Sequence, residues 1–276
     1  MVPVAVGAGC AVGAGIDGAA PVWWRIAVAG VVSLALQVGV NYANDYSDGV
    51  RGTDDVRVGP VRLVASGLAS PAAVKRAALL SFGVAAAAGL SLAATTTWWL
   101  LVVGAVSIAA GWFYTGGPRP YGYLGLGEIF VFVFFGLVAT VGTTYVAVER
   151  VTWLSIVAGS MVGCLACALL VINNLRDIPT DRDVGKRTLA VRLGDRRTRI
   201  FYVSLIVSAF LLVIVAAALW RPPVLLALVG VPVAVGPLRA VLGGAPGRAL
   251  IPVLGATGKA QLAIGAGFTL GAILAA

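Results

Sequence analysis

Two short stretches of the chain place amide and carboxylate side chains at regular spacing, each directly after a long apolar run. The first stretch, "NYANDYSD", supplies Asn41, Asn44, Asp45 and Asp48. The second, "NNLRDIPTDRD", supplies Asn173, Asp177 and Asp181. Residues four apart share one face of a helix, so each stretch can direct several oxygen atoms to the same side.

Carboxylates gathered at a membrane boundary are costly unless a cation neutralises them. The chain has no histidine, and oxygen ligands without His or Cys indicate a hard ion, which favours Mg²⁺ over Ca²⁺. The alternative is a pair of solvated loops that only set topology, and the repeated spacing argues against it. We therefore predict a Mg²⁺ site in which the aspartates also carry the catalysis, formed by Asn44, Asp45, Asp48, Asp177 and Asp181.

Basic residues near both stretches suit the oxygens of a diphosphate, which commonly completes the coordination of Mg²⁺. The predicted diphosphate-binding residues are Arg57, Arg62, Arg119, Lys186 and Arg187. The rest of the ligand should be apolar, because the site opens into a bundle of apolar helices, and a polyprenyl diphosphate meets both demands. Asn41, Asn173 and Tyr114 are expected to line the cavity. For Tyr114 and Arg119, an interfacial anchor and a topology-setting charge are equally good interpretations.

The elements that position these residues are predicted to be membrane helices. Of 276 residues, 60% are hydrophobic and 11% are charged, whereas about a quarter are charged in soluble domains. The apolar runs approach the ~20 residues that a helix needs to cross a bilayer. We predict an all-α, polytopic membrane protein, with a short first span rather than a cleaved leader. The nine expected spans are 1–16, 22–46, 73–94, 97–115, 125–147, 152–175, 199–220, 223–242 and 249–275.

The net charge of +9 has an uneven distribution along the chain. Basic residues gather in the longer connections 47–72, 116–124 and 176–198 and in the brief 243–248, whereas the opposite side holds Arg25, Arg150 and Arg221. Lys259 falls inside the last span. The positive-inside rule places the longer connections, and with them the site, in the cytoplasm of a cell whose plasma membrane holds the chain. The charge then needs no nucleic-acid partner.

The chain is predicted to form a single domain over residues 1–276. The two acidic stretches end spans two and six, which suggests an internal duplication of four-helix units, 1–124 and 125–242, followed by a last helix at 249–275. Cys164 and Cys167 form a C-x-x-C pattern, but no second cysteine pair completes a zinc site, and two small buried residues are the better interpretation.

At the acidic stretches the sequence resembles the UbiA superfamily of intramembrane prenyltransferases. Its signatures N-D-x-x-D and D-x-x-x-D correspond to Asn44, Asp45 and Asp48 and to Asp177 and Asp181. The strings "NDYSDGVRGTDDVRVGPVRLVASG", "YTGGPRPYGYLGLGE" and "NNLRDIPTDRDVGKRTLAVRLG" are similar to the branch that prenylates 1,4-dihydroxy-2-naphthoate in menaquinone biosynthesis.

The resemblance implies nine helices around a central cavity, two Mg²⁺ ions bridged by diphosphate, and a side opening for the lipid tail. It also implies the reaction. A polyprenyl group passes from its diphosphate to 1,4-dihydroxy-2-naphthoate, with loss of CO2 and diphosphate, and demethylmenaquinone results.

Two departures from the branch stand out. Many relatives have a further aspartate where this chain has Gly52, so Asp54 or Asp55 could take over that role, or neither does. Relatives also usually begin with a basic, proline-containing stretch, whereas this sequence begins "MVPVAVGAG", and we expect that its start codon is assigned late.

Three alternative functions remain. A CDP-alcohol phosphatidyltransferase needs a D-G-x-x-A-R signature that "DGVRGTDD" does not supply. A prenyltransferase of the same family could use another acceptor, such as 4-hydroxybenzoate, homogentisate, chlorophyllide or a phosphoribosyl donor. A transporter with acidic coupling sites would place ionisable residues near the bilayer midplane, where Glu128 and Lys259 are the candidates.

Overall fold

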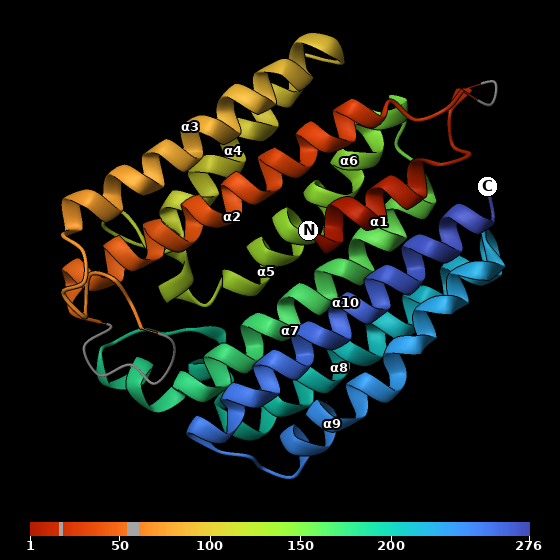
Figure 1. Cartoon of the computed structure of the whole chain (residues 1–276). Helices are drawn as coiled ribbons and strands as arrows, with labels where there is room; N and C mark the ends of the chain where they lie inside the picture. Colours follow the sequence, from red (N-terminus) through yellow and green to blue (C-terminus); the bar gives the residue numbers. More distant parts are fainter. Residues whose placement is uncertain (17–18, 54–60) are drawn as a thin grey trace.

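The computed structural model describes residues 1–16, 19–53 and 61–276, and this part of the chain is helical and contains no strand (Figure 1). Its long helices are α2 (Trp23–Arg51), α3 (Pro71–Thr95), α7 (Trp153–Asp183), α8 (Leu189–Leu219) and α10 (Leu250–Leu274). The shorter helical segments are α1 (Val2–Ala11), α4 (Trp99–Phe113), η2 (Tyr121–Leu124), α5 (Gly127–Val131), η3 (Phe132–Val138), α6 (Ala139–Val148), η4 (Pro222–Val229), α9 (Gly230–Leu242) and η5 (Gly247–Ala249).

Seven helical segments are long and apolar enough to cross a membrane: α2, α3, Gly127–Val148, α7, α8, Pro222–Leu242 and Gly247–Leu274. The chain is therefore a multi-pass membrane protein. Two further apolar helices, α1 and α4, have 10 and 15 residues, fewer than the ~20 that span a bilayer. The number of nine crossings, like the internal duplication, stays a prediction.

Both acidic stretches lie on helices, and the connections after them are shorter than predicted. Helix α2 continues to Arg51, where Gly52 adopts a left-handed φ of 70° that favours glycine and ends the helix. Helix α7 continues through Pro179 to Asp183. The predicted connections 47–72 and 176–198 were therefore wrong at their first residues, because the helical hydrogen bonding extends through the polar turns.

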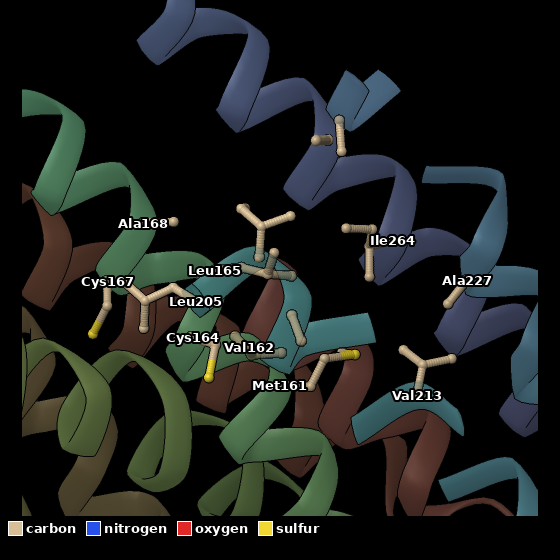
Figure 2. Packing of buried hydrophobic residues seen from close by; sticks show 14 of the residues in the cluster. Met161, Val162, Cys164, Leu165, Cys167, Ala168, Leu205, Val213, Ala227 and Ile264 are labelled. Atoms are coloured by element: carbon tan, nitrogen blue, oxygen red, sulfur yellow. The ribbon is translucent and has the colours of Figure 1, made fainter. Parts of the chain in front are cut away.

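Helix α7 is the most buried membrane helix, with 67% of its most apolar window buried inside the protein. It contacts α8, α10, α1 and η3. Buried apolar side chains fill these contacts, including Met161, Leu165 and Ala168 of α7 and Ile264 of α10 (Figure 2). Both cysteines of the C-x-x-C pattern are free and buried in this core, as predicted.

The segment 127–148 is not one regular helix. A π-helical stretch, η3, separates α5 from α6. At its centre, Gly136 lies against the backbone of α7, so close that a Cβ atom there would come 2.5 Å from the Cα of Gly163. Glycine at these positions permits the close approach of the two segments. π-Helical turns are frequent at functional sites.

Figure 1 shows α2, α3 and α4 on one side of the molecule and α7, α8, α9 and α10 on the other, with α1, α5 and α6 between them. Residues of α2, α3, α4, α6, α7 and α10 all line one cavity of about 860 Å³. The two groups of helices thus enclose an internal space, and the acidic stretches of α2 and α7 lie at the ends of two of its walls.

Candidate active site

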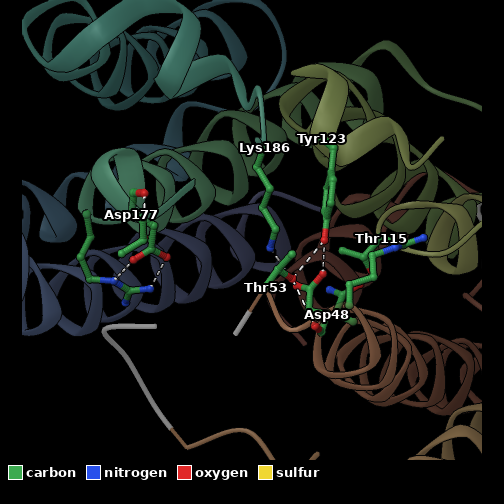
Figure 3. Close-up of polar contacts among 10 residues, drawn as sticks. Asp48, Thr53, Thr115, Tyr123, Asp177 and Lys186 are labelled. Carbon is green, nitrogen blue, oxygen red and sulfur yellow. Dashed lines mark hydrogen bonds and ion pairs between the residues drawn. The ribbon is translucent and has the colours of Figure 1, made fainter. Parts of the chain in front are cut away.

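Asp48 of α2 is buried and accepts hydrogen bonds from two distant parts of the chain (Figure 3). The hydroxyl of Tyr123, in η2, donates to Oδ1 at 2.6 Å, and the ammonium of Lys186 donates to Oδ2 at 3.2 Å. Burial and the Asp48 carboxylate raise the pKa of Tyr123, which keeps this hydroxyl protonated as a donor. The predicted ligand Asp48 and the predicted diphosphate-binding residue Lys186 are therefore neighbours.

Lys186 lies in the turn between α7 and α8, with its ammonium 4.7 Å from the centre of the Tyr123 ring. Burial by itself would lower the pKa of Lys186, but the negative charges of Asp48 and Asp181 outweigh burial and raise it. Lys186 therefore stays positive, and its charge lies within electrostatic reach of one acid from each stretch. Lys186 thus supplies positive charge to the two acids.

Asp177 lies apart from Asp48 (Figure 3) and is paired with the preceding residue. Arg176 donates from Nε to Oδ1 at 2.7 Å and from Nη2 to Oδ2 at 2.6 Å. The same Nη2 donates to Asn173 Oδ1 at 2.8 Å. Sequence reasoning missed this role of Arg176, which it counted only as a cytoplasmic charge, although its position inside "NNLRD" was available as a signal.

The other two predicted metal ligands of the first stretch, Asn44 and Asp45, have different partners. Asn44 accepts a hydrogen bond from the Thr115 hydroxyl at 2.8 Å and lines the cavity. The Asp45 carboxylate accepts the backbone N–H groups of Leu63 and Val64, each at 2.9 Å. Asp45 thus holds the chain at residues 63 and 64 against α2, and its predicted role as a metal ligand stays a prediction.

The remaining predicted site residues are distributed unevenly. Asn41 lines the cavity, and Asn41 Nδ2 donates to the Gln37 carbonyl at 2.8 Å. Tyr114 also lines the cavity. Arg62 is half-buried, whereas Arg119 and Arg187 are exposed. Arg57, Asp54 and Asp55 lie outside the described residues.

Two cations of the site were missed from the sequence, the first of them because its partners are distant along the chain. Arg51 donates to the carbonyls of Thr115 and Gly117, and its guanidinium lies 5.6 Å from the centre of the Tyr123 ring. It therefore fixes the turn that brings Tyr123 over Asp48. Arg176, described above, is the second.

Glu128, in the first turn of α5, is buried next to the cavity wall. Its Oε1 accepts a hydrogen bond from Asn174 Nδ2 at 3.0 Å, and its Oε2 has no partner among the residues that the structure describes. Tyr114 lies within electrostatic reach of Glu128, Asp48 and Asp181. The polar end of the cavity is therefore electronegative on two sides.

The donor chemistry of the predicted ligands suits a hard divalent cation, since they are carboxylates and an amide. Within the ranges 1–16, 19–53 and 61–276, however, no three acidic side chains come close enough together to hold a metal ion. Asp48 and Asp177 are each paired with a basic side chain instead. The residues suit Mg²⁺ by their type and charge. In this structure, however, the Asp48 and Asp177 carboxylates form ion pairs with Lys186 and Arg176.

The profile of the UbiA prenyltransferase family matches residues 1–248. The chain belongs to this family. Among similar proteins, the 1,4-dihydroxy-2-naphthoate octaprenyltransferase of Mycobacterium tuberculosis is 52% identical over 243 residues, which cover 88% of this chain and 83% of the relative. The protein with the same description in Escherichia coli is 36% identical over 208 residues, which cover 70% and 68%.

Solved structures show the same family fold. A UbiA homologue from Archaeoglobus fulgidus, bound to DMAPP and Mg²⁺, superimposes with a TM-score of 0.59 at 13% identity, over 100% of this chain and 96% of that one. Digeranylgeranylglyceryl phosphate synthase superimposes with a TM-score of 0.57 at 14% identity, over 99% and 92%. The family resemblance predicted from the two aspartate motifs is confirmed.

Proposed function

We propose that this protein transfers a polyprenyl group from polyprenyl diphosphate to 1,4-dihydroxy-2-naphthoate, with release of diphosphate and CO2, in the biosynthesis of menaquinone. The observation that supports this most is the 860 Å³ apolar cavity whose polar end carries Asn44 and adjoins the Asp48–Lys186 pair. The names of the relatives at 52% and 36% identity supply the acceptor.

The polar end of the cavity would hold the diphosphate. Lys186, together with the predicted diphosphate-binding residues Arg62, Arg119 and Arg187, would neutralise the charge that grows on the leaving diphosphate. Stabilisation of this kind commonly contributes more to catalysis than any other effect. Magnesium, held by Asp48, Asp177 and Asp181 with Asn44, would supply Lewis-acid stabilisation of the same oxygens. Asp45 would keep the returning chain at residues 63 and 64 against α2.

The apolar part of the cavity would hold the polyprenyl chain and exclude water. When the bond between the first prenyl carbon and oxygen breaks, an allylic cation remains that water would otherwise trap. The electron-rich naphthoate ring forms the new carbon–carbon bond, its carboxyl group leaves as CO2, and the ring is left as the quinol form, demethylmenaquinol. Its oxidation to demethylmenaquinone is a separate two-electron step that requires an oxidant from outside this reaction. We place this site at the cytoplasmic face, since the basic residues of the connections gather there.

The direct test incubates membranes containing the protein with labelled prenyl diphosphate, Mg²⁺ and a panel of aromatic acceptors. We expect a prenylated product with 1,4-dihydroxy-2-naphthoate, loss of product after chelation with EDTA, and its return when Mg²⁺ is restored. Transfer to 4-hydroxybenzoate or homogentisate in its place would refute the assigned acceptor, and transfer that persists in EDTA would refute the metal requirement.

A further inference from the structure

The cavity has two chemically different walls. Among the described residues, the aromatic side chains that line it are Tyr114, Tyr121, Phe130, Phe134 and Phe135, and all five come from the segment 114–135. The lining residues from α1, α2, α3, α4 and α10 are mostly Ala, Gly, Val and Leu. A flexible aliphatic chain packs well against the second wall, so the aromatic wall is available for another ligand.

Four of these rings form a continuous row, which we call the aromatic row. Tyr114 meets Tyr121 edge-on, with centroids 5.5 Å apart. Tyr121 stacks on Phe130 with centroids 3.9 Å and planes 23° apart, and Phe130 stacks on Phe134 at 6.0 Å. The Tyr121 hydroxyl donates to the carbonyl of Ala110 at 2.7 Å, which anchors the row to α4. The row is therefore held in place before any ligand binds.

The stacking decides which ligand suits the row. Tyr121 and Phe130 cover one face of each other, and Phe130 also stacks on Phe134, so the row uses much of its face area internally and leaves ring edges as its main contact for a ligand. Ring edges carry partial positive charge and attract the electron-rich face of another ring in T-shaped contact. A carbocation prefers ring faces instead. The aromatic row therefore suits an electron-rich planar ring better than it suits the allylic cation.

The position of the row fits the second substrate. Tyr114, at one end, is within electrostatic reach of Asp48 and Asp181, where the diphosphate would lie, and of Glu128, whose Oε2 has no hydrogen-bond partner in the described chain. The π-helical η3, which carries Phe134, interrupts the regular helix beside the row. The hydroxyl groups of a hydroxylated ring at this end of the row could donate hydrogen bonds toward these acidic side chains.

We propose that the aromatic row of Tyr114, Tyr121, Phe130 and Phe134 is the binding subsite for the aromatic acceptor, a planar hydroxylated bicyclic ring, while the aliphatic wall holds the prenyl chain. This inference deepens the proposed function and rests on it. It assigns the two substrates to different sets of lining residues in one cavity, so substitutions in the row should affect one substrate and spare the other.

The test compares Phe130→Leu with a matched control, Phe113→Leu, at an exposed position of α4 that does not line the cavity. Binding of 1,4-dihydroxy-2-naphthoate to the purified full-length protein is measured by its fluorescence without donor, and KM is measured for both substrates. We expect Phe130→Leu to raise the Kd and KM of the acceptor about threefold to tenfold, the range given by loss of one aromatic pair, with the KM of prenyl diphosphate unchanged. Phe113→Leu should change none of these.

An unchanged acceptor Kd in Phe130→Leu would overturn the proposal, as would a rise in the KM of prenyl diphosphate without a rise for the acceptor. If Phe130→Leu does not fold, the wild-type protein decides: it should bind the fully aromatic naphthoate more tightly than the 5,6,7,8-tetrahydro analogue, and equal binding would overturn the proposal. Absence of transfer to the naphthoate by wild type would instead refute the proposed function. The binding comparison, which needs no turnover, would still report on the row.

Discussion

Asp48 receives a phenol from one side and an ammonium from the other, and both partners are far from it in sequence. The Tyr123 hydroxyl is 75 residues away and the Lys186 ammonium 138. Together they hold one carboxylate in a fixed direction with its charge balanced.

Asp48→Asn tests the need for that charge while preserving the size of the side chain. We expect kcat/KM to fall roughly 100-fold or more, because electrostatic stabilisation of the leaving group is lost. The matched control is Asp183→Asn, an exposed position at the end of α7. Prenyl transfer is measured in membranes with protein amounts equalised. Near-normal turnover by Asp48→Asn would contradict the role of Asp48.

Lys186→Met and Arg187→Met separate two adjacent cations that sequence reasoning treated alike. Lys186 is buried beside Asp48, whereas Arg187 is exposed. We expect Lys186→Met to raise the KM of prenyl diphosphate about tenfold, since a hydrogen bond between charged groups contributes ~1.5–3 kcal/mol. Arg187→Met should have a much smaller effect. Equal effects of the two substitutions on KM would show that burial beside Asp48 does not distinguish them.

Among the elements, the helical ends of α2 and α7 are the part of the site that periodicity predicts best. The spacing of Asn44 with Asp48 and of Asp177 with Asp181 places each pair on one face only if the chain is helical there. Both stretches are helical. The aspartate motifs and the apolar runs could be identified in the sequence because each consists of residues close together along the chain. The pairing of Asp48 with Tyr123 and Lys186, and the stacking of Tyr121 on Phe130, depend on tertiary contacts that no local pattern encodes.

The π-helix η3 is a second feature that the sequence did not reveal. The apolar run 125–147 predicts an uninterrupted span, because a π-helical stretch has the same composition as an α-helix. Its position follows from the packing of Gly136 against Gly159 and Gly163 of α7, which brings the two backbones into contact. These glycines are visible in the sequence, but the sequence does not show that Gly136 packs against Gly159 and Gly163.

Gly136→Ala tests that contact. An added Cβ would come 2.5 Å from the Cα of Gly163, so the segments must separate, and overpacking of this kind costs ~1–3 kcal/mol. We expect a lower midpoint of thermal unfolding in detergent. Gly142→Ala, in α6, is the control, since its Cβ would meet open space. If both variants unfold at the wild-type temperature, the close approach of η3 and α7 does not contribute to stability.

At the scale of the whole molecule, the distribution of charge between the two membrane faces predicts orientation. The acidic ends of α2 and α7 and most of the basic residues lie together, and the opposite ends carry Arg25, Arg150 and Arg221. These three bind backbone carbonyls at that face, and Arg25 also pairs with Glu149 at 2.7 Å. The sparse charges there serve packing, whereas the dense ones surround the site.

Cysteine labelling on intact cells measures this orientation. The native Cys10, Cys164 and Cys167 are buried and free, so they should give little background. With a thiol reagent that does not cross membranes, we expect labelling of Val151→Cys and none of Asp183→Cys until the cells are permeabilised; both positions are exposed. The reverse pattern would place the active site on the outer face.

The long sequence separation within the Asp48 cluster also has a consequence for the order in which the protein is made. Ribosomes add about 5–20 residues per second, so Asp48 enters the membrane roughly ten seconds before Lys186 is synthesised. During that interval Tyr123 becomes available first, and its phenol can bind the carboxylate without adding positive charge. The cation that pairs with Asp48 in the finished structure is therefore synthesised with the later half of the chain, and arrival of the turn after α7 completes the Asp48 cluster before α8, α9 and α10 are made.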